Sequence, residues 1–454
     1  MSESASPAGP QDEDLLEQVA SMPNLASALL HVASNAGAAG VDGRTVDEVV
    51  GRSRSLLPHL RDQLRSGRYR PGDIRRVWIP KPGGGQRGLG IPNVVDRWVQ
   101  QAVFQVLEPI FEPTFHDSSH GFRPNRGAHT AIAEAKKHIE AGYEIVVDLD
   151  LSDFFDRVHH QSAAGGMSRL AQRVCDGRVL KLVHRMLKAK VVMPDGRRVS
   201  AQAGSPQGGP LSPLLSNIVL DELDWALERR GLRFVRYADD VNIYVRSQRA
   251  GHRVMGSTRR LIEGRLRLKV NDAKSTVSTP DRLHFLGFRL TRQSDGSVEV
   301  GLSARTEQRI KAHIRAMTPR TWGHSLGLCT ERLNRYLRGW MAYFRLCHAS
   351  EERLLKACDA HIRRSANGGR AILVRQKRRS RHLYRHLRRR GVPSRAASKS
   401  AFNRRGTWYR SATPGMHRAY PNAWFATRLV SLWATWQALN PPERASGQQL
   451  MLFD

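Results

Sequence analysis

The chain has 454 residues, and its 73 lysines and arginines outnumber its 41 aspartates and glutamates, which gives a formal net charge of +32. At roughly 100 to 200 residues per domain, this length allows about two to four domains. With 40% hydrophobic residues, the composition excludes a small secreted scaffold and a membrane protein. It favours a globular chain with a polyanionic partner.

The cysteine spacing indicates a reducing compartment, and the amino-terminal residues show no signal for export. The four cysteines stand far apart without a CxxC pair, which argues against a disulfide framework and a zinc site. The amino terminus is polar and acidic, and no apolar run approaches the roughly 18 residues of a membrane helix. We therefore expect a cytoplasmic protein with no membrane partner.

The first third of the chain is mainly helical in pattern. Residues 1–20 are rich in Ser, Ala, Pro and acidic residues without periodicity, which predicts a disordered tail. From Leu25 to Glu108 apolar residues recur at helical spacing. Glycine and proline in Ile79–Pro92 interrupt this pattern and indicate a loop or β-hairpin between two strands.

The middle of the chain has a mixed pattern. From Tyr143 to Gly301, short β-branched runs alternate with helical stretches such as Leu211–Glu228, which predicts an α+β fold. Residues 303–365 return to helical periodicity. They carry four large apolar residues on one face and predict a small helical domain: Leu333, Leu337, Trp340 and Phe344.

The stretch from His361 to Pro442 is the compositional outlier, with 19 lysines and arginines and no acidic residue. Such a run can be a solvated or disordered face, above all at Arg375–Arg390. Interleaved aromatic residues favour a folded nucleic-acid-binding module instead. They are Trp408, Tyr409, Tyr420, Trp424 and Trp433.

Two acidic segments are candidates for a metal site. Tyr237–Asp240 places two carboxylates between two apolar runs, which predicts a hairpin with both carboxylates near one pocket. In Ile145–Phe155, Asp148 and Asp150 share one face of a strand, and periodicity cannot choose between them. Each carboxylate alone could cap a strand end. Together they favour hard divalent cations, which bind oxygen ligands.

Four sequence blocks, taken in order, carry a family resemblance. They are His120–Pro124, Asp150–Phe155, Gly204–Pro213 and Tyr237–Asp240. The set resembles the reverse transcriptases encoded by bacterial group II introns, over about residues 25 to 435. The shorter, endonuclease-less members are the better match, because the chain ends soon after Trp436 with no cysteine pairs, and we expect no target-strand nuclease.

The resemblance implies a right-hand polymerase, with fingers and palm built on an antiparallel sheet, a helical thumb and a basic DNA-binding domain. The implied boundaries are a disordered tail at 1–20, an N-terminal extension and fingers at 21–142, a palm with remaining fingers at 143–302, a thumb or maturase X domain at 303–365, a DNA-binding domain at 366–440 and a tail at 441–454.

The resemblance also assigns the active-site residues. Asp150, Asp239 and Asp240 would be catalytic and hold two Mg²⁺ ions. Asp150 is preferred to Asp148 because the family places its carboxylate five residues before the aromatic residue that guards the sugar pocket, here Phe155.

Other assignments concern the substrates. The incoming dNTP would contact Lys81, Arg87, Phe155 and Gln207. Nucleic acid would contact Arg123, Lys274, Arg335, Arg338, Arg404 and Arg405. The strand Phe285–Phe288 would grip the primer end.

The resemblance implies an RNA-directed DNA polymerase that binds its intron RNA, promotes splicing and copies the integrated intron. Its partners would be group II intron RNA, an RNA template with a DNA primer, target DNA and dNTPs. Two alternatives stay open. One is a non-catalytic RNA-binding maturase that keeps the palm as a scaffold, and the other is a domesticated or defence-associated reverse transcriptase without an intron.

Overall fold

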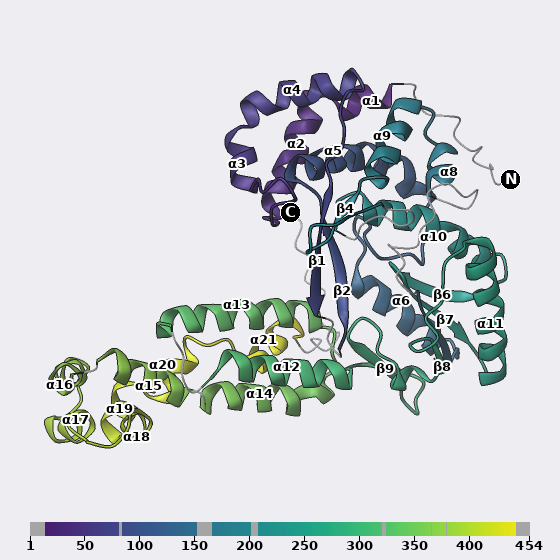
Figure 1. Ribbon diagram of the computed structural model, residues 1–454. Coiled ribbons are helices and arrows are strands. Elements are labelled where there is room, and N and C mark those ends of the chain that lie inside the picture. The colour runs from purple at the N-terminus through teal and green to yellow at the C-terminus, as the bar shows by residue number, and fades with distance from the viewer. Residues whose placement is uncertain are drawn as a thin grey trace, which may run out of the picture. The chain divides into compact units, whose positions relative to one another are not determined.

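The computed structural model describes residues 14–80, 84–151, 166–200, 208–319, 324–364, 366–377 and 379–441, apart from the side chains of 363–368. The chain divides into two compact units, one up to Thr279 and the other from Pro280 (Figure 1). Each unit has its own apolar core. No helix in the described ranges is long and apolar enough to cross a bilayer.

The first unit begins with a group of helices in which α5 is central. These are α1 (Leu15–Val19), α2 (Met22–Ser34), α3 (Val46–Gly51), α4 (Ser53–Arg65) and α5 (Val94–Phe111), followed by the 3₁₀ turn η1 (Glu112–Thr114). Trp98 of α5 is fully buried, and its indole N–H donates to the carbonyl of Leu25 at 2.6 Å. The predicted helical lead-in is confirmed.

The prediction of a disordered tail over residues 1–20 is wrong for residues 15–19, which form α1. Leu15, Leu16 and Val19 are buried in the core around α5. The carboxylate of Asp176 also accepts a hydrogen bond from the Leu16 N–H at 2.9 Å. Apolar burial and this long-range contact, rather than local periodicity, order the segment.

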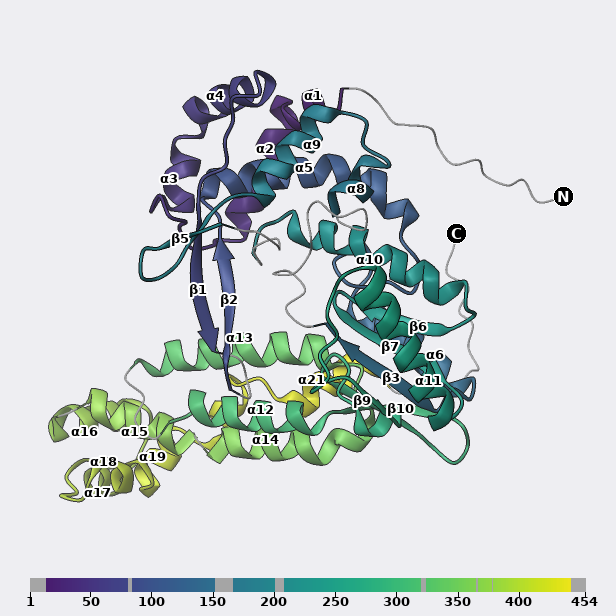
Figure 2. The ribbon, with the colours of Figure 1, turned by 45° about the vertical axis from the view of Figure 1, so that its right-hand side comes forward.

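A four-stranded sheet contains the predicted hairpin. Its order is β2-β1-β4-β5, with β1 (Ile74–Pro80), β2 (Gln86–Ile91), β4 (Val191–Val192) and β5 (Arg198–Val199). β1 and β2 are antiparallel from Arg75 opposite Ile91 to Pro80 opposite Gln86. The hairpin projects from the preceding helices (Figure 2). Helices α8 (Gly166–Ala171) and α9 (Gly177–Leu187) complete this region.

The second sheet of this unit has the order β6-β7-β3-β8 and is antiparallel throughout. Its strands are β3 (Ile145–Asp150), β6 (Arg233–Tyr237), β7 (Asp240–Val245) and β8 (Thr276–Ser278), and its helices are α6 (Ala128–Glu140), α10 (Ser212–Glu228), α11 (Gln248–Arg260) and the π-helical turn η2 (Leu261–Arg265). Helices α6 and α11 lie on opposite sides of this sheet (Figure 1).

Strand alternation explains how this sheet supports a site. One face buries apolar residues against α10 and the turn that follows α11, among them Val147, Leu149, Val241 and Ile243. The alternate positions of β3 therefore place Asp148 and Asp150 together on the other face. Apolar packing of one face thus fixes the register of the polar face.

The second unit begins with an antiparallel hairpin and three long helices. The elements are η3 (Pro280–Arg282), β9 (Phe288–Arg292), β10 (Val298–Leu302), α12 (Ala304–Met317), α13 (Leu326–Phe344), η4 (Ala349–Glu351) and α14 (Glu352–Arg364). The apolar stripe predicted for α13 is confirmed, because Leu333 and Leu337 are buried and Trp340 and Phe344 pack against the same core.

The basic stretch folds into seven short helices within the described ranges. They are α15 (Ala366–Gln376), α16 (Ser380–Arg389), α17 (Ser394–Ala401), α18 (Thr407–Ser411), α19 (Pro414–Ala419), α20 (Asn422–Ala426) and α21 (Leu432–Leu439). Leu383, Leu387, Met416 and Phe425 lie in one buried cluster. The expectation of a folded module, rather than a solvated run of charge, is confirmed.

Two details near residue 285 differ from the sequence expectation. The strand predicted at Phe285–Phe288 is wrong for its first residues, because β9 begins only at Phe288. Leu286 and Gly287 have φ of 51° and 91° and form a reversal, which strand propensity does not reveal. Residues 280–302, which we placed with the palm, belong to the second unit by their contacts.

Candidate active site

The β6–β7 hairpin carries two of the predicted carboxylates. Tyr237 at the end of β6 pairs with Asp240 at the start of β7, so Ala238 and Asp239 form the reversal between them. Ala238 has φ of 58°, in the left-handed region that non-glycine residues rarely adopt. Such a conformation persists only where surrounding contacts hold it.

The sheet register brings the third carboxylate to the same end. Asp150, the last residue of β3, stands opposite Asp240, and Asp148 stands opposite Asn242 on the same face. Directly opposed residues have Cβ atoms about 4.5–5.5 Å apart. The structure therefore gathers Asp150, Asp239 and Asp240 at one edge of the sheet, with Asp148 next to them.

These carboxylates disfavour one another's negative charge. Burial raises the pKa of Asp240 well above its ordinary value, and the charges of Asp148, Asp239 and Asp150 raise it further. Burial likewise raises the pKa of Asp239. Burial and the Asp150 charge raise the pKa of Asp148 to about 7. A partly buried group of carboxylates of this kind attracts cations.

Cationic side chains of the protein offset part of the negative charge of these carboxylates. Lys274 Nζ lies 3.0 Å from Asp150 Oδ2, and the amide of Asn271 donates to the same oxygen at 3.0 Å. Lys274 and Arg87 also lower the pKa of Asp239, in opposition to burial. Among the described residues, Lys274 and Arg87 are thus the cations that act on this group of four carboxylates.

The donor set suits a hard divalent cation, which prefers carboxylate oxygens. In the described ranges, no three His, Cys, Asp or Glu side chains already converge as metal ligands. Asp150 is instead bound by Lys274 and Asn271. A cation that takes Asp150 Oδ2 must replace the Lys274 ammonium there.

A buried arginine supports the hairpin reversal. Arg236 is fully buried, and its guanidinium pairs with Asp224 of α10, with Nη2 and Oδ2 at 2.6 Å. The same guanidinium donates to Asn217 Oδ1 and to the Ala238 carbonyl at 3.0 Å each. It also donates to Ser119 Oγ at 2.7 Å. One side chain thus ties the reversal to α10 and to the block around His120.

The block around His120 packs directly against the reversal. The His120 N–H donates to the Arg236 carbonyl at 2.8 Å, which adds an extra strand-like contact beside β6. A Cβ on Gly121 would lie 2.4 Å from the backbone nitrogen of Ala238. Glycine is therefore required at residue 121 for this close backbone approach.

The hairpin β1–β2 presents Arg87 at an exposed position opposite Ile79. Lys81, Phe155 and Gln207, which the resemblance assigns to the dNTP, lie outside the described residues. Gly208, next to Gln207, has φ of 135°, and a Cβ there would lie 2.4 Å from the Gly90 carbonyl of β2. The Gly204–Pro213 block therefore meets the hairpin at a glycine contact.

The six residues assigned to nucleic acid fall into different environments. Arg123 is buried, lies 2.9 Å from Glu112, and donates to the carbonyls of His116 and Ser119. These contacts within the fold use its donors, and its assignment to nucleic acid stays a prediction. Lys274 lies beside the carboxylates. The other four assigned residues belong to the second unit and are exposed: Arg335, Arg338, Arg404 and Arg405.

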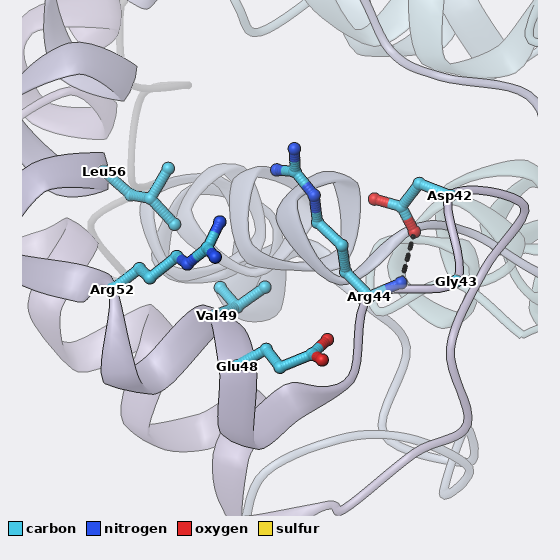
Figure 3. Close-up of a pocket in the computed structure, with 7 residues that line it drawn as sticks. All are labelled: Asp42, Gly43, Arg44, Glu48, Val49, Arg52 and Leu56. Atoms are coloured by element: carbon cyan, nitrogen blue, oxygen red, sulfur yellow. Dashed lines mark hydrogen bonds between the residues drawn. The ribbon is translucent and has the colours of Figure 1, made fainter.

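A separate hollow of about 300 Å³ lies among the N-terminal helices (Figure 3). Its lining consists of Asp42, Gly43, Arg44, Glu48, Val49, Arg52 and Leu56. Asp42 accepts a hydrogen bond from the Arg44 N–H at 3.2 Å, and Glu48 accepts one from the Thr45 N–H at 2.8 Å. Two arginines match two carboxylates, so this hollow lacks the excess negative charge of the sheet edge.

Residues 79–290 match the family described as Reverse transcriptase (RNA-dependent DNA polymerase), and residues 307–391 match Group II intron, maturase-specific domain. Protein YkfC of Escherichia coli (strain K12) is 36% identical over 293 residues, which cover 56% of this chain and 76% of YkfC. The chain belongs to the reverse transcriptase family. The presence of both regions confirms the resemblance to group II intron reverse transcriptases and the α+β polymerase fold class.

Two other similarities cover different shares of each protein. Group II intron-encoded protein LtrA of Lactococcus lactis subsp. cremoris is 36% identical over 204 residues, or 45% of this chain and 33% of LtrA. The chain therefore spans about a third of LtrA. A solved structure of telomerase from Candida albicans with a fragment of telomeric RNA has a TM-score of 0.41 and 13% identity, covering 67% of this chain and 62% of that chain.

Sequence reasoning missed the residues that hold the reverse transcriptase hairpin in place. Arg236, Asp224, Asn217 and Ser119 form the buried network, and Asn271 binds Asp150. One signal was available in the sequence of β6, because Arg236 directly follows the apolar residues Phe234 and Val235 and must find a partner once it is buried. The identity of that partner required the fold.

Gly121→Ala should destabilise the first unit by about 1–3 kcal/mol, because overpacking against the Ala238 backbone forces a shift. Chemical denaturation would measure the loss. Gly177→Ala is the matched control, since a Cβ there meets nothing within 4 Å. Equal stability of Gly121→Ala and the wild type would show that the contact is not tight.

Asp221→Asn should stabilise the first unit above about pH 6. Burial and the nearby Asp224 raise the pKa of Asp221 to about 6, although Arg236 and Arg169 oppose this shift. Because the folded pKa exceeds the unfolded one, ionisation costs stability as pH rises from about 4 to 6. Removing the charge should add about 1–2 kcal/mol at pH 8 after a discount for partial exposure, and nothing near pH 4.

Thermal or urea unfolding at about pH 8 and pH 5 would measure the effect of Asp221→Asn. Asp195→Asn is the control, because the pKa of Asp195 is lowered by hydrogen bonds from Arg197 and its charge is favourable. A gain for Asp221→Asn that did not shrink at the lower pH would contradict the electrostatic cause.

Proposed function

We propose that this protein is an RNA-directed DNA polymerase that also binds group II intron RNA and assists its splicing. The polymerase proposal rests on the carboxylates of Asp150, Asp239 and Asp240 at one edge of the sheet, within the reverse transcriptase match. The pKa values of Asp239 and Asp240 are raised, although Lys274 and Arg87 oppose the shift at Asp239. This remaining excess of negative charge supports a site for added cations.

The family uses divalent ions, and we propose two Mg²⁺ ions held by Asp150, Asp239 and Asp240. Such ions would activate the primer 3′-hydroxyl for in-line attack on the α-phosphate of a dNTP and stabilise the pyrophosphate leaving group. Asp240 and Asp150 are placed by the strand register, and Asp239 by the reversal that Arg236 supports. Carboxylates held in this way would be ready to bind the ions before substrate binds.

The remaining roles concern substrate charge and shape. Arg87 on the projecting hairpin and Lys81 would face the triphosphate, whose developing negative charge needs cations besides the metals. Phe155 would lie beneath the sugar and exclude a 2′-hydroxyl, and Gln207 would contact the sugar. Lys274, which pairs with Asp150 in the structure, would face the substrate phosphates when Asp150 holds a metal ion instead.

The maturase-specific match at 307–391 supports binding of intron RNA by the second unit. The basic stretch 361–442, without a single acidic residue, supports binding of target DNA and of the template–primer duplex. We propose exposed Arg335, Arg338, Arg404 and Arg405 as contacts to these nucleic acids.

Asp239→Asn/Asp240→Asn should abolish primer extension. The double substitution keeps the side-chain shape but removes two anionic metal ligands, and we expect a loss of at least about 10³-fold in rate. The assay is extension of a DNA primer with dNTPs and Mg²⁺ on an annealed RNA template and on a matched DNA template.

Two controls separate lost chemistry from lost folding. The variant should bind the template–primer duplex as well as the wild type, and Asp195→Asn, which removes an exposed carboxylate in the same unit, should extend normally. No synthesis by a folded, RNA-binding wild type would instead favour the non-catalytic maturase.

Arg338→Ala and Arg335→Ala offer a matched pair for the RNA surface of α13. Arg335 already pairs with Glu331 at 2.7 Å, whereas the described residues provide no ion pair for Arg338. Arg338→Ala should therefore lower the slope of log affinity against log salt by about 0.7–0.9, and Arg335→Ala by less. Titration of a structured intron RNA at several salt concentrations measures both slopes, and equal slopes in all three proteins would remove α13 from the interface.

A further inference from the structure

Three aromatic side chains are exposed on adjacent segments of the carboxyl-terminal helices. Phe402 follows α17, and Trp408 and Tyr409 lie in α18. They expose 50%, 49% and 45% of their surface. Arg404 and Arg405 lie between them in sequence and are exposed too. We call these five residues the aromatic patch.

The backbone under the aromatic patch is held firmly. Arg410 of α18 donates through Nη2 to the Ala401 carbonyl at 2.7 Å, which joins the end of α17 to α18. Asn403 Oδ1 accepts from the Arg405 N–H at 2.8 Å and fixes the turn between them. A Cβ on Gly415 would lie 2.4 Å from Ser400 Oγ, so α19 packs closely on α17. Loose packing therefore does not explain the exposed rings.

The same module buries other aromatic residues. Tyr420 and Phe425 are each only 3% exposed. The Arg390 guanidinium covers the Tyr420 ring at 4.2 Å. The fold thus has a core that accepts large rings, yet Phe402 and Trp408 stay outside it. Large apolar rings that stay exposed among charged residues are typical of a binding site.

The charge of the surroundings selects an anionic partner. No Asp or Glu occurs between residues 361 and 442. The Arg405 guanidinium lies 4.5 Å above the Tyr409 ring, so cation and ring form one surface. Arginine attracts phosphate, whereas an aromatic ring gains most from a bare base face.

Base faces are available only where bases are unpaired. In a duplex the bases stack on one another, so a protein meets only the base edges in the grooves and the phosphates of the backbone. A surface for duplex phosphates needs arginine and lysine but gains little from half-exposed rings. The combination of Phe402, Trp408 and Tyr409 with Arg404 and Arg405 therefore matches single-stranded nucleic acid better than duplex.

We propose that the aromatic patch binds unpaired nucleotides of RNA or DNA, with bases stacked on Trp408 and Phe402 and phosphates at Arg404 and Arg405. This inference rests on the proposed function in taking nucleic acid as the partner, and it adds the strandedness that this part of the chain selects. It does not depend on polymerisation.

Phe402→Ala/Trp408→Ala in the full chain tests the proposal. Fluorescence anisotropy without dNTPs would compare a short labelled RNA strand, a DNA strand of the same sequence, and the corresponding duplexes. We expect affinity for at least one single strand to fall roughly 10-fold or more, and affinity for duplexes to change less than about 3-fold. The strand that loses more identifies the preferred nucleic acid.

Three further variants define the cause. Trp408→Phe keeps a ring and should stay within about 3-fold of the wild type on single strands. Trp225→Ala, which removes a tryptophan 41% exposed on α10 of the first unit, should not change the preference for single strands. Arg404→Ala/Arg405→Ala should weaken binding to single strands and duplexes and lower the salt dependence.

Equal losses on single strands and duplexes for Phe402→Ala/Trp408→Ala, or no loss on either, would overturn the proposal. The Asp239→Asn/Asp240→Asn protein should retain the single-strand preference. A wild-type protein that prefers single strands but makes no DNA would therefore refute the proposed catalytic function alone. A wild-type protein that makes DNA without this preference would refute the proposal for the aromatic patch alone.

Discussion

The site depends on one buried ion pair, between Arg236 of β6 and Asp224 of α10. A guanidinium without exposure to water is tolerable only when its donors are satisfied, and Arg236 meets Asp224, Asn217, Ser119 and the Ala238 carbonyl. The last contact holds the strained reversal that positions Asp239. The contacts that satisfy the buried guanidinium therefore also hold the reversal that carries Asp239.

The sheet edge combines opposite electrostatic demands. A chain with a net charge of +32 concentrates negative charge where Asp148, Asp150, Asp239 and Asp240 meet. Protonation relieves part of this repulsion, and Lys274 relieves another part. A divalent cation would relieve more, because it replaces one ammonium with two charges. The surplus of positive charge elsewhere suits the nucleic acid that the proposed polymerase activity would bring to these carboxylates.

Sequence patterns predicted what local chemistry decides. Alternation and the acidic pair placed the β6–β7 hairpin, and periodicity placed α13 with Leu333 and Leu337 inside. What failed depends on distant contacts: α1 is ordered by the core and by Asp176, and the reversal at Leu286 interrupts a run that reads as strand. Arg123 belongs to a motif that suggests nucleic acid, and in the fold its guanidinium pairs with Glu112. Its assignment to nucleic acid stays a prediction.

Exposure of aromatic residues is the feature that sequence predicts least. Trp408 and Phe425 are both large rings in a stretch without acidic residues. The structure buries Phe425 and leaves Trp408 half exposed. Contacts of Arg410 and Gly415 hold α17, α18 and α19 close together, and the buried cluster of this module contains Phe425 but not Trp408. A ring kept outside a well-packed core can stack on a ligand without the protein unfolding, which links the packing of this module to the base binding that we propose for it.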